Sequence, residues 1–166
     1  MARDNGRHVL LLLVENRPGV LLRVVSLISR RGFNIDSLSV GPTEDPTRSR
    51  ITIITDVDDE AWEQITKQLN KLIVVHKIAD LTKEPSIERE LVLFKVNAPA
   101  EKRSEVIEIA NLFRASIVDV GKSSLTIEAT GDEDKMKGME DLLRAYGIKE
   151  ITRTGKIAMS RNSKDM

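Results

Sequence analysis

The hydrophobic positions of the chain divide it into short segments with two different periods. Residues 9–14 (VLLLLV) are apolar without interruption, which is typical of a strand buried on both faces. Residues 20–28 repeat apolar side chains at helical spacing, and Gly32 follows where a helix C-terminal cap belongs. The pattern then favours a strand at residues 34–41, a strand at 50–56, a helix at 58–72 and a strand at 74–81. The predicted order is strand, helix, strand, strand, helix, strand.

The second half of the chain repeats this order. The pattern predicts a strand at residues 91–96, a helix at 104–113, a hairpin of residues 116–120 and 125–130 around Gly121, a helix lined by Met136, Met139, Leu143 and Tyr146, and a final strand within 148–159. A polar, proline-containing segment, residues 83–86, separates the halves. We therefore expect an α+β fold of two ferredoxin-like βαββαβ units in tandem, residues 1–82 and 87–166. Because a unit of about 80 residues is small and leaves sheet edges open, oligomerisation is expected.

Composition excludes several classes of function. The 26 Lys and Arg residues balance the 26 Asp and Glu residues, so no basic field attracts nucleic acid or anionic lipid. The absence of cysteine excludes a disulfide framework, thiol catalysis and cysteine-based metal sites. Aromatic residues are 3% of the chain, too few for an RNA-binding sheet of this topology. The sequence has neither a signal peptide nor an apolar run near the ~20 residues that span a bilayer, so a cytoplasmic protein is expected.

No pattern of residues predicts catalysis. The glycines form no P-loop or G-x-G-x-x-G, and neither G-x-S-x-G nor H-E-x-x-H occurs. His8 and His76 lie at a strand start and within a strand pattern, and we interpret them as surface or hydrogen-bonded strand residues. The adjacent acids at residues 58–60 suit a helix N-terminus better than a metal site. We therefore expect no catalytic residue, no metal site and no cofactor in this chain.

The turn after the first predicted strand is the strongest candidate for a binding site. Pro18 suits the first position of the following helix, and Asn16 the capping region before it. The first N–H groups of a helix have no intrahelical partners, and the helix dipole adds partial positive charge there. Gly19 has no side chain, so a ligand can approach the backbone. These features favour a pocket for a small carboxylate.

An amino-acid ligand also needs acceptors for its ammonium group, and the side-chain oxygens of Asn16 and Asn34 are the candidates. Asn34 follows the helix, so it lies at the far end from Gly19. Two protomers related by a twofold axis, with these helices antiparallel, can offer both groups to one ligand. The alternative interpretation is that Pro-Gly is an ordinary helix entry and Asn34 an ordinary turn residue.

The stretch ENRPGVLLRVVSLISRRGFNIDSLSVGPTEDPTRSRITI, residues 15–53, resembles the small regulatory subunit of acetohydroxyacid synthase (acetolactate synthase), an ACT-domain family. The E-N-x-x-G, R-G-F-N-I-x-S-L and D-P-T-x-S-R-x-T-I motifs together carry the resemblance, which extends over nearly the whole chain. It implies that residues 1–82 form an ACT domain for effector binding and dimerisation, and that 87–166 form a C-terminal ACT-like domain that mainly affects the effector response.

The resemblance implies a non-catalytic regulatory subunit. Such a subunit activates the catalytic subunit and confers feedback inhibition by valine in branched-chain amino-acid biosynthesis. Its partners would be the large catalytic subunit, expected to use thiamine diphosphate, magnesium and FAD, and a second copy of the chain, with no nucleic acid or membrane. The effector-binding positions that the resemblance implies are Asn16, Gly19, Val20 and Leu21 of one protomer, with Asn34 and Ile35 of its neighbour.

Two further expectations accompany the resemblance. The second domain lacks the Pro-Gly turn, so a second amino-acid site there is not expected. The alternative function is a stand-alone ACT-type amino-acid sensor that regulates a different enzyme or a transcription factor.

Overall fold

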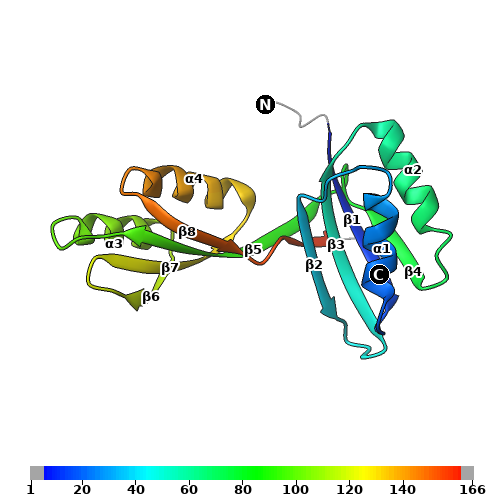
Figure 1. The fold of residues 1–166 in the computed structure, drawn as a ribbon, viewed down its shortest axis with the longest axis horizontal. Helices are drawn as coiled ribbons and strands as arrows, with labels where there is room; N and C mark the ends of the chain where they lie inside the picture. The colour runs from blue at the N-terminus through cyan, green and yellow to red at the C-terminus, as the bar shows by residue number, and fades with distance from the viewer. Residues whose placement is uncertain (1–5, 162–166) are drawn as a thin grey trace. The chain divides into compact units, whose positions relative to one another are not determined.

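The computed structural model describes residues 6–161, and its elements follow the predicted order (Figure 1). The first repeat contains β1 (Arg7–Glu15), α1 (Val20–Ser29), β2 (Ser37–Pro42), β3 (Arg48–Asp56), α2 (Asp59–Leu69) and β4 (Val75–Asp80). The second contains β5 (Ser86–Asn97), α3 (Arg103–Leu112), β6 (Ser116–Val120), β7 (Ser124–Gly131), α4 (Glu133–Arg144) and β8 (Ile148–Arg153), and β9 (Ile157–Ser160) follows it. The α+β fold with two βαββαβ units is confirmed.

The two sheets have the same antiparallel topology. The strand order is β2-β3-β1-β4 in the first repeat and β6-β7-β5-β8 in the second, and β9 pairs with β5. Each order places the first strand of the repeat in the interior of its sheet and the second strand at an edge. The edge strands β2 and β6 therefore each have one side without a partner strand within residues 6–161.

The first unit is built around β1, whose apolar run is buried on both faces as predicted. One face, with Leu10, Leu12 and Val14, packs against helices α1 and α2, which lie on the same side of the sheet (Figure 1). The opposite face presents Val9 and Leu11, which form a second cluster with Ile54, Leu81 and Ala158. Because a strand buried on both faces needs cover on both sides, the fold supplies Ala158 of β9 for the second face.

The position of β9 differs from the domain boundaries expected from the sequence. Among the described residues, 6–87 and 156–161 form one compact unit and 88–155 form the other. The strand predicted within residues 148–159 is interrupted at Gly155, which has a φ of 84°, and continues as β9. Lys156 N–H donates to Ser37 Oγ over 2.7 Å, and Arg161 N–H donates to the Pro85 carbonyl over 2.8 Å. Residues 156–161 thus belong with the first unit rather than the second.

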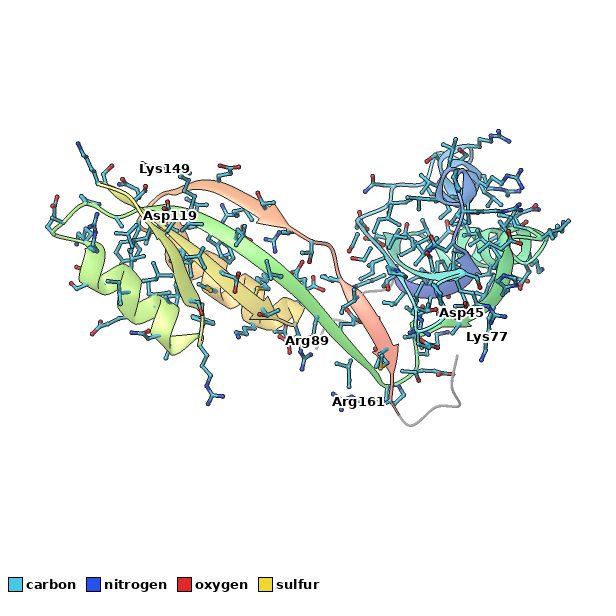
Figure 2. The ribbon with its side chains drawn as sticks, turned by 90° about the horizontal axis from the view of Figure 1, so that it is seen from below. Asp45, Lys77, Arg89, Asp119, Lys149 and Arg161 are labelled. Carbon is cyan, nitrogen blue, oxygen red and sulfur yellow. The ribbon has the colours of Figure 1, made fainter. Side chains whose placement is uncertain are left out.

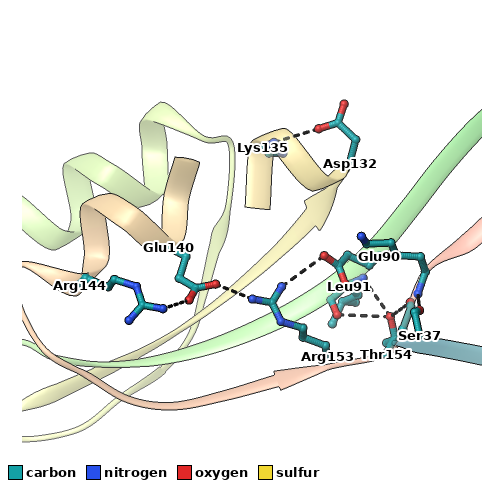
Figure 3. Close-up of polar contacts among 11 residues, drawn as sticks. Ser37, Glu90, Leu91, Asp132, Lys135, Glu140, Arg144, Arg153 and Thr154 are labelled. Atoms are coloured by element: carbon teal, nitrogen blue, oxygen red, sulfur yellow. Dashed lines mark hydrogen bonds and ion pairs between the residues drawn. The ribbon is translucent and has the colours of Figure 1, made fainter. Parts of the chain in front are cut away.

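The second unit has its own apolar core, and an arginine links two of its strands and one of its helices through ion pairs. Val92, Phe94 and Val96 of β5 pack against α3 and α4. Arg153 of β8 bonds to Glu90 of β5 at 3.3 Å and to Glu140 of α4 at 2.5 Å (Figure 3). Glu90 is only 6% exposed, so this guanidinium supplies the countercharge that a buried carboxylate requires.

The described residues contain neither a helix that could cross a membrane nor a cluster of metal-binding side chains. None of the helices within residues 6–161 is both long enough and apolar enough to cross a membrane. In the same part of the chain, no group of three or more His, Asp or Glu side chains is arranged to hold a metal ion.

Candidate functional site

The turn between β1 and α1 depends on the left-handed backbone of Gly19. Its φ is 84° and its ψ is −12°, a conformation that side chains other than those of Asn and Asp rarely adopt. A Cβ added at this position would meet no atom within 4 Å. The backbone, and not packing, therefore favours glycine at this position, and the space in front of Gly19 is open.

The helix begins later than the sequence suggested. Pro18 was expected at the first helical position, but α1 starts at Val20 and Gly19 is the N-cap residue. Asn16 does not cap the helix either, because its side chain bonds elsewhere. The physical reason is that Gly19, the residue after Pro18, has a left-handed backbone. Because this conformation is not helical, the helix can begin only at the next residue, Val20.

The N-terminus of α1 is left open to a ligand, unlike those of α2 and α4. Asp58 and Asp132 cap α2 and α4 through side-chain oxygens at 2.7 Å from Ala61 N and 3.0 Å from Lys135 N. In the described part of the chain, α1 has no side-chain cap and no acidic residue in its first turn. Val20 N–H donates to the Arg17 carbonyl over 3.4 Å, so the next N–H groups, those of Leu21 and Leu22, and the positive end of the helix dipole are available to an anion.

Asn16 is held by the loop between β2 and β3. Its backbone N–H donates to the Thr47 carbonyl over 2.8 Å, and its side-chain Nδ2 donates to the Pro46 carbonyl over 2.9 Å. The opposite amide orientation would place two oxygens against each other, so this one is set by chemistry. Among the described residues, Asn16 Oδ1 takes no hydrogen bond, and it remains available as an acceptor.

Asn34 presents the same free acceptor at the other end of α1. Its Nδ2 donates to Asp36 Oδ1 over 2.6 Å, and its backbone carbonyl accepts from Thr55 Oγ1 over 2.6 Å. Within residues 6–161 its Oδ1 also has no hydrogen-bond partner. The ten residues of α1 separate Asn34 from Gly19 by about 15 Å, too far for one small ligand to contact both in one protomer.

The three apolar residues of the predicted site have different surroundings. Val20 is 4% exposed and belongs to the core, so it can contact a ligand only through its backbone. Leu21 is 39% exposed beside the turn, and Ile35 is half-buried against the core near Asn34. The structure therefore brings Asn16, Gly19, Val20 and Leu21 together and places Asn34 and Ile35 at the opposite end of α1.

The sequence analysis did not predict that the loop between β2 and β3, residues 43–47, bonds to Asn16. Asp45 (labelled in Figure 2) accepts from the Thr47 hydroxyl at 2.6 Å and from the Thr47 backbone N–H at 2.9 Å. These two bonds, and then the charges of Arg48 and His76, lower the pKa of Asp45. No local pattern in the sequence indicates this contact, which follows from the strand register: Glu15 pairs with Arg48, so Asn16 lies opposite Thr47.

The corresponding turn of the second unit is closed by the chain itself. Ala98 N–H donates to the Ser123 carbonyl over 2.8 Å, which makes Ala98 the counterpart of Asn16. The Arg103 guanidinium donates to the carbonyls of Ala98 (3.3 Å), Gly121 (2.8 Å) and Lys122 (2.8 Å). A cationic side chain thus occupies the acceptors of this turn.

Comparisons with known proteins agree with the sequence motifs. Residues 10–77 match the family described as the AHAS small subunit-like ACT domain, and residues 89–162 match the family described as the small subunit of acetolactate synthase. The first match confirms that the first unit is an ACT domain.

Individual relatives match over nearly their whole length. The chain is 56% identical over 158 residues to the probable acetolactate synthase small subunit of Archaeoglobus fulgidus, aligning 95% of this chain with 99% of that protein. It is 53% identical over 161 residues to the acetolactate synthase small subunit of Mycolicibacterium smegmatis, with 97% and 95% covered. A crystal structure of the small subunit from Thermotoga maritima matches with a TM-score of 0.84 at 39% identity, covering 95% of this chain and 99% of that one.

Proposed function

Because the chain belongs to the family of acetolactate synthase small subunits, we propose that it activates the catalytic subunit of that enzyme and makes it sensitive to feedback inhibition by valine. The effector binds at the turn between β1 and α1. The partner is the large catalytic subunit, a thiamine-diphosphate enzyme that also uses magnesium and FAD, and the assembly works in the cytoplasm.

The observation that carries this proposal is the set of open groups around α1. The helix start offers the N–H groups of Leu21 and Leu22, and Gly19 leaves the space in front of the helix free, so a carboxylate fits there. Asn16 and Asn34 each use the amide nitrogen within the chain and leave the oxygen for an ammonium group. A zwitterionic amino acid carries one group of each kind. The exposed Leu21 supplies apolar contact for a branched side chain.

The site is completed by a second copy of the chain. A single protomer separates Asn34 from Gly19 by the length of α1, about 15 Å. Two protomers with antiparallel α1 helices across a twofold axis bring the Asn34 and Ile35 end of one helix to the Gly19 end of the other. The proposed functional unit is therefore a homodimer whose two effector sites each draw on both protomers.

The two units have different tasks in this proposal. Residues 1–82, together with β9, which completes their core, bind the effector, dimerise and contact the catalytic subunit. The second unit mainly affects the size of the effector response. Its turn is filled by Arg103 and takes no amino acid.

Two measurements test the proposal. The purified chain should bind valine in calorimetric titration, and it should raise the activity of the added catalytic subunit, with valine reversing part of that increase. Binding of valine without any effect on the synthase would favour the alternative, a stand-alone amino-acid sensor. Absence of valine binding, with the chain dimeric and folded, would reject the effector site.

A further inference from the structure

We infer that Asn16 couples effector binding to the order of the loop between β2 and β3, so that residues 43–48 become the surface that changes when the effector binds. The inference rests on the proposed function, since it takes valine as the effector. It assigns a role to a loop that otherwise only connects two strands.

The first step is that the loop is fastened to the effector turn through Asn16. Besides the strand ladder, two hydrogen bonds among the described residues join them: Asn16 N–H donates to the Thr47 carbonyl and Asn16 Nδ2 donates to the Pro46 carbonyl. Both acceptors are backbone carbonyls, so the position of Asn16 depends on the loop conformation. Asn16, Pro46 and Thr47 are exposed, which means that these bonds compete with water and can be made or lost at small cost.

The second step is that the loop has an internal structure that these bonds select. Thr43 N–H donates to the Arg48 carbonyl and Arg48 N–H donates to the Asp45 carbonyl, each over 3.0 Å. Asp45 accepts from Thr47 through both its hydroxyl and its backbone N–H. The carbonyls of Pro46 and Thr47 point at Asn16 only while this turn is intact. Ordering of the loop and orientation of Asn16 are therefore one event.

The third step is that the Asn16 amide has two ends with different partners. Its nitrogen holds Pro46, and its oxygen is the acceptor proposed for the effector ammonium. An ammonium bound to the oxygen fixes the amide plane and strengthens the donor at the nitrogen, because hydrogen bonds in a chain polarise one another. By linkage, an effector that favours the ordered loop is itself bound more tightly by it.

In the second unit the corresponding turn is held by a side chain of the protein itself. Ala98 has no amide to share, and the Arg103 guanidinium instead joins the Ala98 carbonyl to those of Gly121 and Lys122 in the turn between β6 and β7. In the second unit a positively charged side chain of the protein thus holds the turn through backbone carbonyls. The turn of the second unit is therefore held by a side chain of the protein, whereas in the first unit a ligand can add to the bonds that Asn16 makes.

Hydrogen exchange on the full-length chain tests the coupling. Saturating valine should slow exchange of the Thr43, Thr47 and Arg48 amides by about fivefold or more, the lower range of allosteric coupling. The turn between β6 and β7, where Gly121 N–H donates to the Ser124 carbonyl, is the internal control and should not change. Valine that binds in calorimetry but leaves the three loop amides unchanged would overturn the inference while leaving the proposed function intact.

Two substitutions at Asn16 separate its roles. Asn16→Asp keeps an oxygen acceptor for ammonium but cannot donate to the Pro46 carbonyl. It should still bind valine in calorimetry, with an affinity changed by the new charge, and at saturating valine it should lose the valine-dependent protection of the loop. Asn16→Ala should lose both, and it should fold, because Ala98 occupies the same position in the second unit.

The results distinguish two roles for Asn16: a link between the effector and the loop, or only a contact of the effector. Loop protection by valine in Asn16→Asp that equals wild type would show that the shared amide is not the link. Failure of the wild-type chain to bind valine at all would reject the proposed function and the inference together.

Discussion

The backbone N–H of Lys156 donates a hydrogen bond to Ser37 Oγ over 2.7 Å, so a residue near the end of the chain is bonded to strand β2 near its beginning (Ser37 is labelled in Figure 3). Two residues later, Ala158 is 7% exposed and packs in the cluster with Val9, Leu11 and Leu81. The apolar core of the first unit thus includes a residue of this C-terminal segment.

The first prediction follows from the packing of Ala158 against β1. Ala158→Asp should destabilise the first unit by about 2 kcal/mol, because it places a carboxylate in an apolar cluster. Met159→Asp is the matched control, since Met159 is 61% exposed, and it should change stability little. The single tryptophan, Trp62, reports unfolding of the first unit by fluorescence, and the single tyrosine, Tyr146, reports the second. Equal effects of the two substitutions would show that β9 does not cover the sheet.

The second prediction concerns charge at the effector turn. Gly19→Asp should weaken valine binding on the order of a hundredfold and leave activation of the catalytic subunit largely intact. A carboxylate about 5 Å from that of the ligand repels it by roughly 3 kcal/mol at an effective dielectric of about 20, less where water screens it. Gly19→Asn is the control, because Asn and Asp both tolerate the φ of 84° but only Asp is charged.

Calorimetric titration of both variants measures the difference. If Gly19→Asp binds valine as well as Gly19→Asn does, the ligand carboxylate does not lie at the start of α1. Loss of binding in both variants would point to steric exclusion at Gly19 rather than to charge.

The third prediction tests whether each site draws on two protomers. Asn34→Ala should weaken valine binding by about tenfold, through loss of one acceptor for the ammonium group. Mixed dimers of Gly19→Asp and Asn34→Ala chains should regain one site of wild-type affinity, because both substitutions then fall in the same site. Mixed dimers without any wild-type site in calorimetry would place the whole site within one protomer. Sedimentation showing a monomer at micromolar concentration would contradict the dimer itself.

The fourth prediction is a pH dependence of the loop. The Thr47 bonds lower the pKa of Asp45 below 3.8, so the ionised form contributes order that is present above pH 3.8 and lost as pH falls through the lower folded value. Thr47→Val removes the hydroxyl donor and keeps the backbone N–H, so it should raise the pKa of Asp45 part of the way to 3.8. Carboxyl NMR titration measures this pKa directly. An unchanged value would show that the hydroxyl bond does not stabilise the carboxylate.

Much of the fold was predictable because its causes are local. The unbroken apolar run of residues 9–14 indicated a strand buried on both faces, and the helical spacing after Gly19 indicated α1. Both follow from the periods of side chains along strands and helices, which depend only on neighbouring residues. The repeated order of elements then led to the α+β assignment, and the motifs of residues 15–53 indicated the family.

The helix boundary and the partners of each site residue were not predictable in the same way. The sequence indicated a turn at Pro18 and Gly19, but the left-handed backbone at Gly19, and with it the start at Val20, depends on how the chain leaves β1. Asn16 was expected near the helix cap, whereas it bonds to Pro46 and Thr47, thirty residues away in the case of Pro46. Only the pairing of β1 with β3 decides this, because the register brings these backbone carbonyls to Asn16.

The sequence by itself thus determined the elements, the repeat and the chemistry available at the turn, because propensity and periodicity are properties of short segments. The tertiary structure alone decided which hydrogen bonds Asn16 makes, that Arg103 fills the second turn, and that Ala158 returns to cover β1. Each of these contacts joins segments far apart in the chain. Their free energy comes from burying apolar surface and pairing polar groups in three dimensions, which no local pattern of residues encodes.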